Sequence, residues 1–278
     1  MVNITAADVN KLRQMSGAGM MDCKKALQET EGDFDKAIDY LRKKGQKVAA
    51  KRADRDANEG IVLSKAAHDY TYAGLIMVNC ETDFVGKTDD FKKFAHDVLD
   101  LCIKNRPTSI EAISAMKLDT MTVAEKLNEM LGKTGEKIQI AHYEFIEAPI
   151  VSAYNHHGNR LATLVGLNNK EVKNVAEIGH ELAMQIAAMN PVAIDKENVS
   201  QETIDREVEI GKEQARQEGK PEEMLEKIAT GKLAKFFKDN TLLNQEFVRD
   251  TKKTVRQFLS ENDKNLQVIG FKRLMLGA

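Results

Sequence analysis

The chain repeats one order of sequence patterns, and this internal repeat constrains its fold more than any other feature. In each half, two apolar runs flank a polar turn, an amphipathic helical pattern follows, and a second helical pattern and a last apolar run close the half. The corresponding segments, in chain order, are 61–78 with 150–165, 91–95 with 172–176, 122–127 with 254–259, and 138–143 with 266–271. Because the same plan recurs in the same order, we predict a duplicated α+β unit, each half with a small, mostly antiparallel sheet backed by helices.

Two segments lie outside this repeat. The first 45 residues carry three short helical patterns separated by a glycine turn at 16–19 and a break at 32–33, which predicts a small three-helix domain. Two apolar stripes flank Gly219-Lys220-Pro221 and predict an antiparallel coiled-coil hairpin inserted into the second half. The expected domains are the three-helix domain at 1–45, a basic linker at 46–59, the first half of the core at 60–147, and the second half at 148–278 with the hairpin at 195–239.

Composition argues against nucleic acid as a general partner. Lys and Arg number 41 against 43 Asp and Glu, so the net charge of −2 creates no overall positive field. Aromatic residues make up 5% and tryptophan is absent, which disfavours base-stacking platforms. No apolar run is long enough to span a bilayer, and the N-terminus lacks a signal-peptide core. The scattered cysteines Cys23, Cys80 and Cys102 are typical of reduced thiols in a cytoplasmic protein. From the charge balance and the absence of a long apolar run, we expect that the protein binds neither DNA nor a membrane.

The sequence contains no recognisable catalytic or cofactor-binding motif. The six histidines are scattered, and no Cys/His spacing suits zinc. No serine or cysteine lies in a nucleophile motif, and there is neither a phosphate-binding loop nor a dinucleotide fingerprint. Gly17-Ala18-Gly19 follows no strand pattern and precedes no Gly-Lys-Ser/Thr sequence. We therefore favour a protein that is not an enzyme, holds no metal or cofactor and has no nucleotide site of its own, and an enzyme with an unrecognised site is the rival hypothesis.

The polar connector after the second apolar run carries residues that the fold does not require. The run 73–78 precedes this connector, and a helical pattern follows it. Because Thr88 or Asp89 can cap that helix, Asp83 is not needed for capping. A carboxylate beside the ring of Phe84 is therefore a candidate contact site. Alternatively, Phe84 folds back as a hydrophobic staple and Asp83 makes an Asx-turn.

Two further features have both a functional and a structural interpretation. Met20 and Met21 follow the glycine turn, where both side chains cannot face so small a core, and methionine suits adaptable binding surfaces. Alternatively, one of them is core and the other is merely exposed. The segment 42–55 contains seven basic residues and a single acidic one, Asp54, which is typical of a solvated linker. If this segment binds RNA instead, the alternative function is that of a ribosome- or RNA-associated binding protein.

Two long motifs resemble the signatures of one known family. The run 15–27, MSGAGMMDCKKAL, resembles the N-terminal signature of bacterial elongation factor Ts, and the run 78–85, VNCETDFV, resembles its second signature. The resemblance extends from Ile4 to about Arg273. It implies a ubiquitin-associated-like N-terminal domain, a duplicated core and a coiled-coil hairpin. It also implies a guanine nucleotide exchange factor of translation elongation, which binds elongation factor Tu with GDP and without nucleotide, promotes GDP release and allows GTP reloading.

The resemblance further implies which part of the second signature acts on the partner. Thr82, Asp83, Phe84 and Val85 are expected to bind elongation factor Tu. Asp83 and Phe84 are expected to wedge between helices of its nucleotide-binding domain and to disturb its Mg²⁺ site. Contact with the ribosome is expected only indirectly. Longer members of the family continue into a C-terminal helix that also touches the partner, whereas this chain stops at Ala278, so that contact is not carried over.

Other matched positions imply holding contacts with the same partner. Arg13, Met20 and Met21 are expected to grip another helix of the nucleotide-binding domain. The family pattern also has a contact histidine before a glycine in the second hairpin, where this chain has two histidines. His156 follows Tyr-Asn as the pattern expects and is the candidate, with His157 as the alternative.

Overall fold

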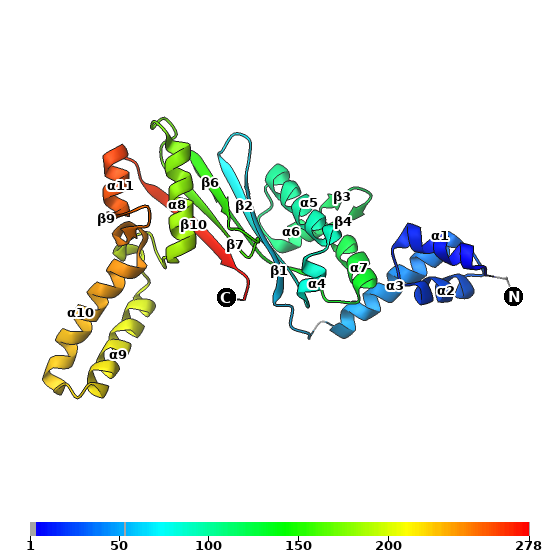
Figure 1. Cartoon of the computed structure of the whole chain (residues 1–278), viewed down its shortest axis with the longest axis horizontal. Helices are drawn as coiled ribbons and strands as arrows, with labels where there is room; N and C mark the ends of the chain where they lie inside the picture. Colours follow the sequence, from blue (N-terminus) through cyan, green and yellow to red (C-terminus); the bar gives the residue numbers. More distant parts are fainter. Residues whose placement is uncertain (1–3, 53, 278) are drawn as a thin grey trace. The chain divides into compact units, whose positions relative to one another are not determined.

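The computed structural model describes the backbone of residues 4–52 and 54–277 and the side chains of 4–45 and 54–277. The helices are α1 (Ala6–Ser16), α2 (Met20–Glu29), α3 (Phe34–Arg52), α4 (Asp83–Gly86), α5 (Asp89–Asn105), α6 (Ile110–Ala115), α7 (Val123–Thr134), α8 (Val175–Met189), α9 (Gln201–Gln217), α10 (Glu222–Asn240) and α11 (Val255–Asn262), with 3-10 turns η1 (Lys196–Asn198) and η2 (Leu242–Asn244). The strands are β1 (Glu59–Ala66), β2 (Tyr72–Cys80), β3 (Lys117–Leu118), β4 (Met121–Thr122), β5 (Gln139–Glu147), β6 (Ile150–Asn155), β7 (Leu161–Leu167), β8 (Glu246–Phe247), β9 (Asp250–Thr254) and β10 (Val268–Met275) (Figure 1). This mixture of helices and small sheets confirms the predicted α+β class.

The strand order of the two larger sheets confirms the predicted repeat. One sheet has the order β1-β2-β5, and the other has the order β10-β7-β6. Read from its other edge, the second sheet is β6-β7-β10, so the hairpin and the last strand of each half occupy equivalent places. Strands β6 and β7 are antiparallel, with Ile150 opposite Leu167 and Asn155 opposite Ala162. The hairpins and the last strands of the two halves therefore follow one structural plan, whereas 91–95 lie within α5 and 172–174 precede α8, so that correspondence is out of register.

The chain forms two compact units, and each has its own apolar core. The first comprises Met1–Leu63, Ile76–Tyr143 and Met275–Ala278, and the second comprises Ser64–Leu75 and Glu144–Leu274. In the first unit, Phe91 and Leu99 on the apolar face of α5 pack in one cluster with Ile76 of β2. In the second, Leu182 of α8 packs in one cluster with Val165 of β7. Each amphipathic helix thus buries its apolar face in the core of its own half.

The last helix of the first half, α7, and the last helix of the second half, α11, begin in the same way. Thr122 starts α7 with a capping box in which its amide donates to Glu125 Oε2 at 2.7 Å. Thr254 starts α11 with the same arrangement, and its amide donates to Gln257 Oε1 at 2.8 Å. Because a capping box satisfies amides that the helix leaves unpaired, both helices begin at these threonines.

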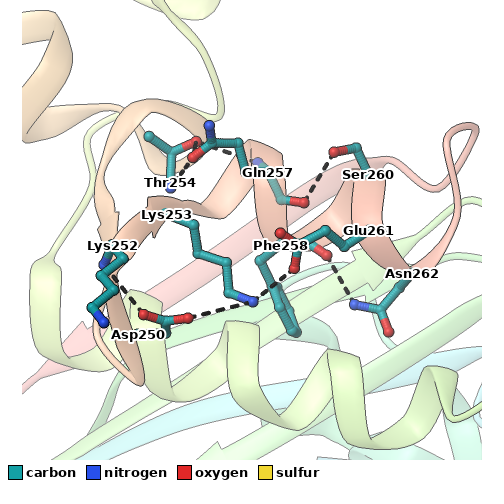
Figure 2. Close-up of polar contacts among 9 residues, drawn as sticks. All are labelled: Asp250, Lys252, Lys253, Thr254, Gln257, Phe258, Ser260, Glu261 and Asn262. Carbon is teal, nitrogen blue, oxygen red and sulfur yellow. Dashed lines mark hydrogen bonds and ion pairs between the residues drawn. The ribbon is translucent and has the colours of Figure 1, made fainter.

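A lysine fixes α11 against the preceding strand (Figure 2). The ammonium of Lys253 lies 3.6 Å from Asp250 and 2.7 Å from Glu261, which lies near the other end of α11. It also lies 5.9 Å from the centre of the Phe258 ring. That ring stacks on Phe247 with the ring centres 4.2 Å apart. Lys253 therefore joins β9 to α11 and covers one edge of this aromatic pair.

Helix α3 is longer than the sequence analysis expects. Residues 46–52, which the sequence analysis places in a basic linker, have a helical backbone that continues from the N-terminal domain. Gly45 is buried, and a Cβ built on it would lie 3.1 Å from the carbonyl oxygen of Asn128 in α7. This glycine therefore permits close packing of α3 on α7 and does not end the helix. The side chains of 46–53 lie outside the described residues.

The inserted hairpin has the thin apolar seam that the sequence predicts. Gly211 and Ala215 of α9 are buried, as are Leu225 and Ala229 of α10. A Cβ built on Gly211 would lie 3.2 Å from the Cα of Ala229, so the two helices approach closely at this glycine. The buried part of the seam is formed by small residues and one leucine, and among the described residues the core cluster of the second unit contains none of α9 or α10.

Backbone hydrogen bonds close the base of the hairpin. The amide of Val192 donates to Asn240 O at 2.8 Å, and the amide of Leu242 donates to Ala193 O at 2.9 Å. Asp195 accepts a hydrogen bond from Asn244 at 2.8 Å and pairs with Arg256. The side chain of Asp195 thus belongs to the body of the second unit, although it lies within the expected hairpin segment 195–239.

We predict that replacing residues 201–238 by a short Gly/Ser linker leaves the protein folded. The ends of the excised segment are already held close by the bonds at Ala193, so closing the loop costs little entropy. Thermal unfolding should remain cooperative, with a midpoint close to that of the parent. A matched deletion that also removes Asp195 should be less stable by about 2 kcal/mol, because Asn244 and Arg256 lose a charged partner. An insoluble product from the shorter deletion contradicts the prediction.

Candidate functional site

The connector between β2 and α5 contains one helical turn, α4, which the sequence analysis describes only as polar. Thr82 is its N-cap, with an extended backbone at φ −125° and ψ 154°, and its hydroxyl accepts from the Val85 amide at 3.5 Å. Thr88 then caps α5 by accepting from the Phe91 amide at 3.3 Å. Since Thr88 caps α5, as the sequence analysis allows, Asp83 is not needed for that task. Among the described residues, the second half has no helix at the equivalent place between β7 and α8.

The side chains of α4 divide sharply between solvent and core. Phe84 is 81% exposed, which makes it the most exposed large apolar side chain of the described residues. Val85 is buried in the core cluster that contains Ile76 and Phe91. The hydrophobic-staple alternative for Phe84 is therefore excluded by its exposure. Val85 packs the turn onto the core, and Phe84 presents its ring to solvent.

Asp83 places an ionised carboxylate beside this ring. Its carboxylate lies 2.5 Å from the ammonium of Lys87, one helical turn further on. This hydrogen bond and the lysine's charge hold the pKa of Asp83 below its usual range. The exposed surface of α4 therefore combines one aromatic ring with one negative charge.

Three small residues let α4 lie directly on the ends of the first two strands. Gly60 has φ +143°, and a Cβ built there would collide with the carbonyl oxygen of Val78. A Cβ on Gly86 would lie 3.4 Å from the sulfur of Cys80 and 3.6 Å from the Cα of Gly60. Burial, with the charge of nearby carboxylates, raises the pKa of the Cys80 thiol to about 12, so this cysteine is a packing residue and not a nucleophile. A glycine directly before an apolar strand, as Gly60 is, is the sequence signal from which this close backbone approach could be predicted.

The candidate methionines lie on the surface of the N-terminal domain. Met20 is 53% exposed and Met21 is 74% exposed, at the first turn of α2. Cys23 and Leu27 fill the inward positions of that helix, so neither methionine is a core residue. Arg13 is exposed in the last turn of α1. Met15, which the sequence analysis does not propose as a contact, is also exposed in that turn.

His156 lies at the edge of a groove in the second unit. The hydroxyl of Tyr154 lies 2.9 Å from Nδ1 of His156, and the Tyr154 ring meets the His180 ring edge-on at 5.7 Å between centres. The groove has a volume of about 270 Å³, and Glu181 and Arg249, joined at 2.6 Å, lie along it. His157 is exposed in the turn beyond β6 and does not line this groove. The tyrosine contact thus sets the orientation of His156 in particular.

Metal ligation and membrane insertion find no support in the described part of the chain. The residues there contain no group of three or more His, Cys, Asp or Glu side chains that could hold a metal ion. None of the described helices combines the length and the apolar character needed to cross a bilayer. The three cysteines Cys23, Cys80 and Cys102 are buried and form no disulfide.

The comparisons with known proteins agree with one another. The family model described as Elongation factor TS matches residues 81–278. The chain is 51% identical to the elongation factor Ts of Christiangramia forsetii over 277 residues, with 100% of both chains covered. It is 50% identical to that of Amoebophilus asiaticus over 275 residues, with 99% of both chains covered. The chain belongs to the elongation factor Ts family. Its role is accordingly that of a translation elongation factor.

The basic segment 42–55 makes some of its contacts within the protein. Lys44 pairs with Asp22 of α2, and Arg55 lies 3.5 Å from Glu81. Arg42 and Lys43 are exposed, and the side chains of 46–53 lie outside the described residues. These contacts do not test the RNA-binding alternative.

Two long-range contacts of the connector, one through Glu81 and one through Glu136, cannot be found from the sequence. Glu136 accepts hydrogen bonds from Thr82, and Glu81 accepts one from the amide of Lys137. These partners are more than 50 residues apart in the sequence, so no local pattern indicates the contact. Only the position of Glu81 inside the second signature marks it as a residue of interest.

Proposed function

We propose that this chain is a guanine nucleotide exchange factor for elongation factor Tu and that α4 is the element that acts on the partner. The observation that carries the proposal is the ring of Phe84, 81% exposed on a capped turn beside the ionised carboxylate of Asp83. Burial of such a ring against apolar groups of a partner is favourable by about 2 kcal/mol, so the exposed ring offers binding free energy that the unbound protein does not use. The ring inserts between helices of the partner's nucleotide-binding domain, and the carboxylate disturbs the neighbouring Mg²⁺.

An exchange factor of this kind makes and breaks no covalent bond. Its effect is a coupling free energy, because binding of the factor weakens nucleotide binding and nucleotide weakens factor binding by the same amount. A hundred- to thousandfold effect requires roughly 3–4 kcal/mol. Burial of a phenylalanine ring supplies about 2 kcal/mol of this. Loss of Mg²⁺, which bridges phosphates and protein ligands, supplies the remainder.

The other candidate residues serve affinity in this proposal. Arg13, Met20 and Met21 hold a further helix of the nucleotide-binding domain, and His156 binds through the groove beside it. Of the four residues expected to bind the partner, Asp83 and Phe84 reach it, whereas we now assign Thr82 and Val85 to holding α4, because Thr82 caps the turn and Val85 is buried. The protein acts in the cytoplasm on elongation factor Tu with GDP and without nucleotide, and it binds no nucleotide by itself.

The test is the release of fluorescent GDP from purified elongation factor Tu in a stopped-flow experiment. Catalytic amounts of the chain should accelerate release in proportion to their concentration, in the presence of excess unlabelled nucleotide. The isolated chain should show no GDP binding by calorimetry. Release at the spontaneous rate contradicts the exchange function, and micromolar GDP binding by the chain alone contradicts the absence of a nucleotide site.

We predict that replacing Met20 and Met21 together by alanine weakens binding to elongation factor Tu without lowering the rate at which the bound complex releases GDP. Both side chains are exposed, so their loss leaves the three-helix core intact. The dissociation constant for nucleotide-free elongation factor Tu should rise about tenfold, which corresponds to about 1.4 kcal/mol, while the release rate at saturating factor is unchanged. Met189→Ala, which changes an exposed methionine of α8, is the control. An unchanged dissociation constant contradicts a holding role for this pair.

A further inference from the structure

Two carboxylates join the start of α4 to the end of α7. The amide and the hydroxyl of Thr82 both donate to Glu136, at 3.0 and 2.6 Å. In the opposite direction, the amide of Lys137 donates to Glu81 at 2.7 Å. Each segment thus supplies one carboxylate that accepts hydrogen bonds and one residue that donates to the carboxylate of the other segment. We call this set of residues, Glu81, Thr82, Glu136 and Lys137, the carboxylate bridge.

The end of α7 directs Glu136 toward Thr82. Gly135 is the C-cap of α7 in the left-handed conformation, at φ +70°, and its amide donates to Leu131 O at 2.8 Å. The amide of Glu136 then donates to the hydroxyl of Thr134 at 3.1 Å. Two local bonds therefore fix the backbone from which the Glu136 side chain extends. Hydrogen bonds to an ionised carboxylate are shorter and stronger than neutral ones, so the bridge is a rigid connection.

Helix α4 depends on such a connection because it is too short to be stable alone. Its four residues form a single turn, and isolated turns of this length are not stable in water. The cap of the turn is the hydroxyl of Thr82, and that same hydroxyl donates to Glu136. Fixing Thr82 therefore fixes the turn that carries Phe84.

We propose that Glu136 is a positioning residue for nucleotide exchange. Through Thr82 it holds α4 in one conformation, so that Asp83 and Phe84 enter the partner without first being ordered. This inference rests on the proposed exchange function. Glu136 itself need not touch the partner, because its effect passes through the cap of α4. Its loss therefore lowers the exchange rate through the conformation of α4 and not through a lost contact.

The first measurement uses the unbound protein and does not depend on exchange activity. The amides of Gly86, Lys87 and Thr88 donate to carbonyls within the turn, so their hydrogen exchange reports its opening. In Glu136→Ala these amides should exchange about tenfold faster than in the parent, while the thermal midpoint changes little. Glu136→Gln should restore protection, since its amide oxygen accepts from Thr82 N and its NH₂ donates to the hydroxyl.

The second measurement is GDP release from elongation factor Tu at saturating factor. Glu136→Ala should lower this rate about tenfold, and Glu136→Gln should recover most of it. The control is Glu125→Ala, because Glu125 accepts the same two bonds from Thr122 at the other end of α7. This control should leave both the turn amides and the saturating rate at parental values.

The outcomes separate the inference from the function on which it rests. Faster turn amides together with a lower saturating rate, both restored by glutamine, support the positioning role. Parental amide protection or a parental rate in Glu136→Ala overturns it and leaves the exchange function standing. If Glu136→Ala and Glu125→Ala lose the same share of the saturating GDP release rate, and each loses it together with a lower thermal midpoint, the role of Glu136 is merely structural. That outcome also overturns the inference. No acceleration of GDP release by the parent overturns the exchange function and, with it, the inference.

Discussion

Phe84→Ala should abolish most of the exchange activity and leave the fold intact. The ring is 81% exposed, so its removal takes almost no buried contact from the core of the first unit. In the proposed complex the same ring is buried between helices of elongation factor Tu, and losing about 2 kcal/mol of burial corresponds to a fall of about thirtyfold in rate. The measurements are GDP release at saturating factor and thermal unfolding of the unbound variant.

The control for this prediction is Phe91→Ala, which removes the same side chain from a fully buried position of α5. That variant should lose about 3–5 kcal/mol of stability, because it leaves a cavity in the core. Phe84→Ala should instead melt within about 2 °C of the parent. A Phe84→Ala protein that exchanges at the parental rate contradicts the role proposed for α4.

Gly60→Ala should cost the protein both stability and activity. At φ +143° an L side chain is strained by about 1–3 kcal/mol, and its Cβ collides with the backbone of Val78. We expect a loss of about 3 kcal/mol in the free energy of unfolding, which should be visible as a lower denaturant midpoint. Because Gly60 also lies against Gly86, the displaced strand end should move α4 and slow GDP release.

Gly219→Ala separates the two causes of this loss. Gly219 has φ +73° at the tip of the hairpin, and a Cβ built there meets no atom within 4 Å. Its replacement should cost about 1–2 kcal/mol from backbone strain alone and leave GDP release unchanged. If Gly60→Ala costs no more than this control, the collision with the Val78 backbone is not important.

The sequence predicts the repeated plan well because that plan is written in local patterns. Thr122 and Thr254 carry capping signals, and the apolar faces of the two long helices follow the helical period. Two details differ from the local pattern: the apolar run stops at Val78 whereas β2 continues to Cys80, and the sequence leaves open that one of Met20 and Met21 is core whereas both are exposed.

What the sequence cannot show depends on partners far along the chain. The turn α4 has too few residues for a period, and its cap is held by Glu136, whose contact no local pattern announces. The same holds for Gly45, at which the expected three-helix domain ends but which packs α3 on α7. Whether Phe84 or Val85 faces solvent is likewise decided by the core onto which the turn packs.

The most direct test of the central claim is a comparison of two affinities. The dissociation constant of the chain is measured for elongation factor Tu with GDP and for the nucleotide-free partner, and that of GDP is measured with and without saturating chain. Since coupling is reciprocal, the two ratios must agree, and we expect each to be a hundred- to thousandfold, or roughly 3–4 kcal/mol. Equal affinity of the chain for both forms of the partner contradicts the account, because a factor that binds both forms equally cannot release GDP.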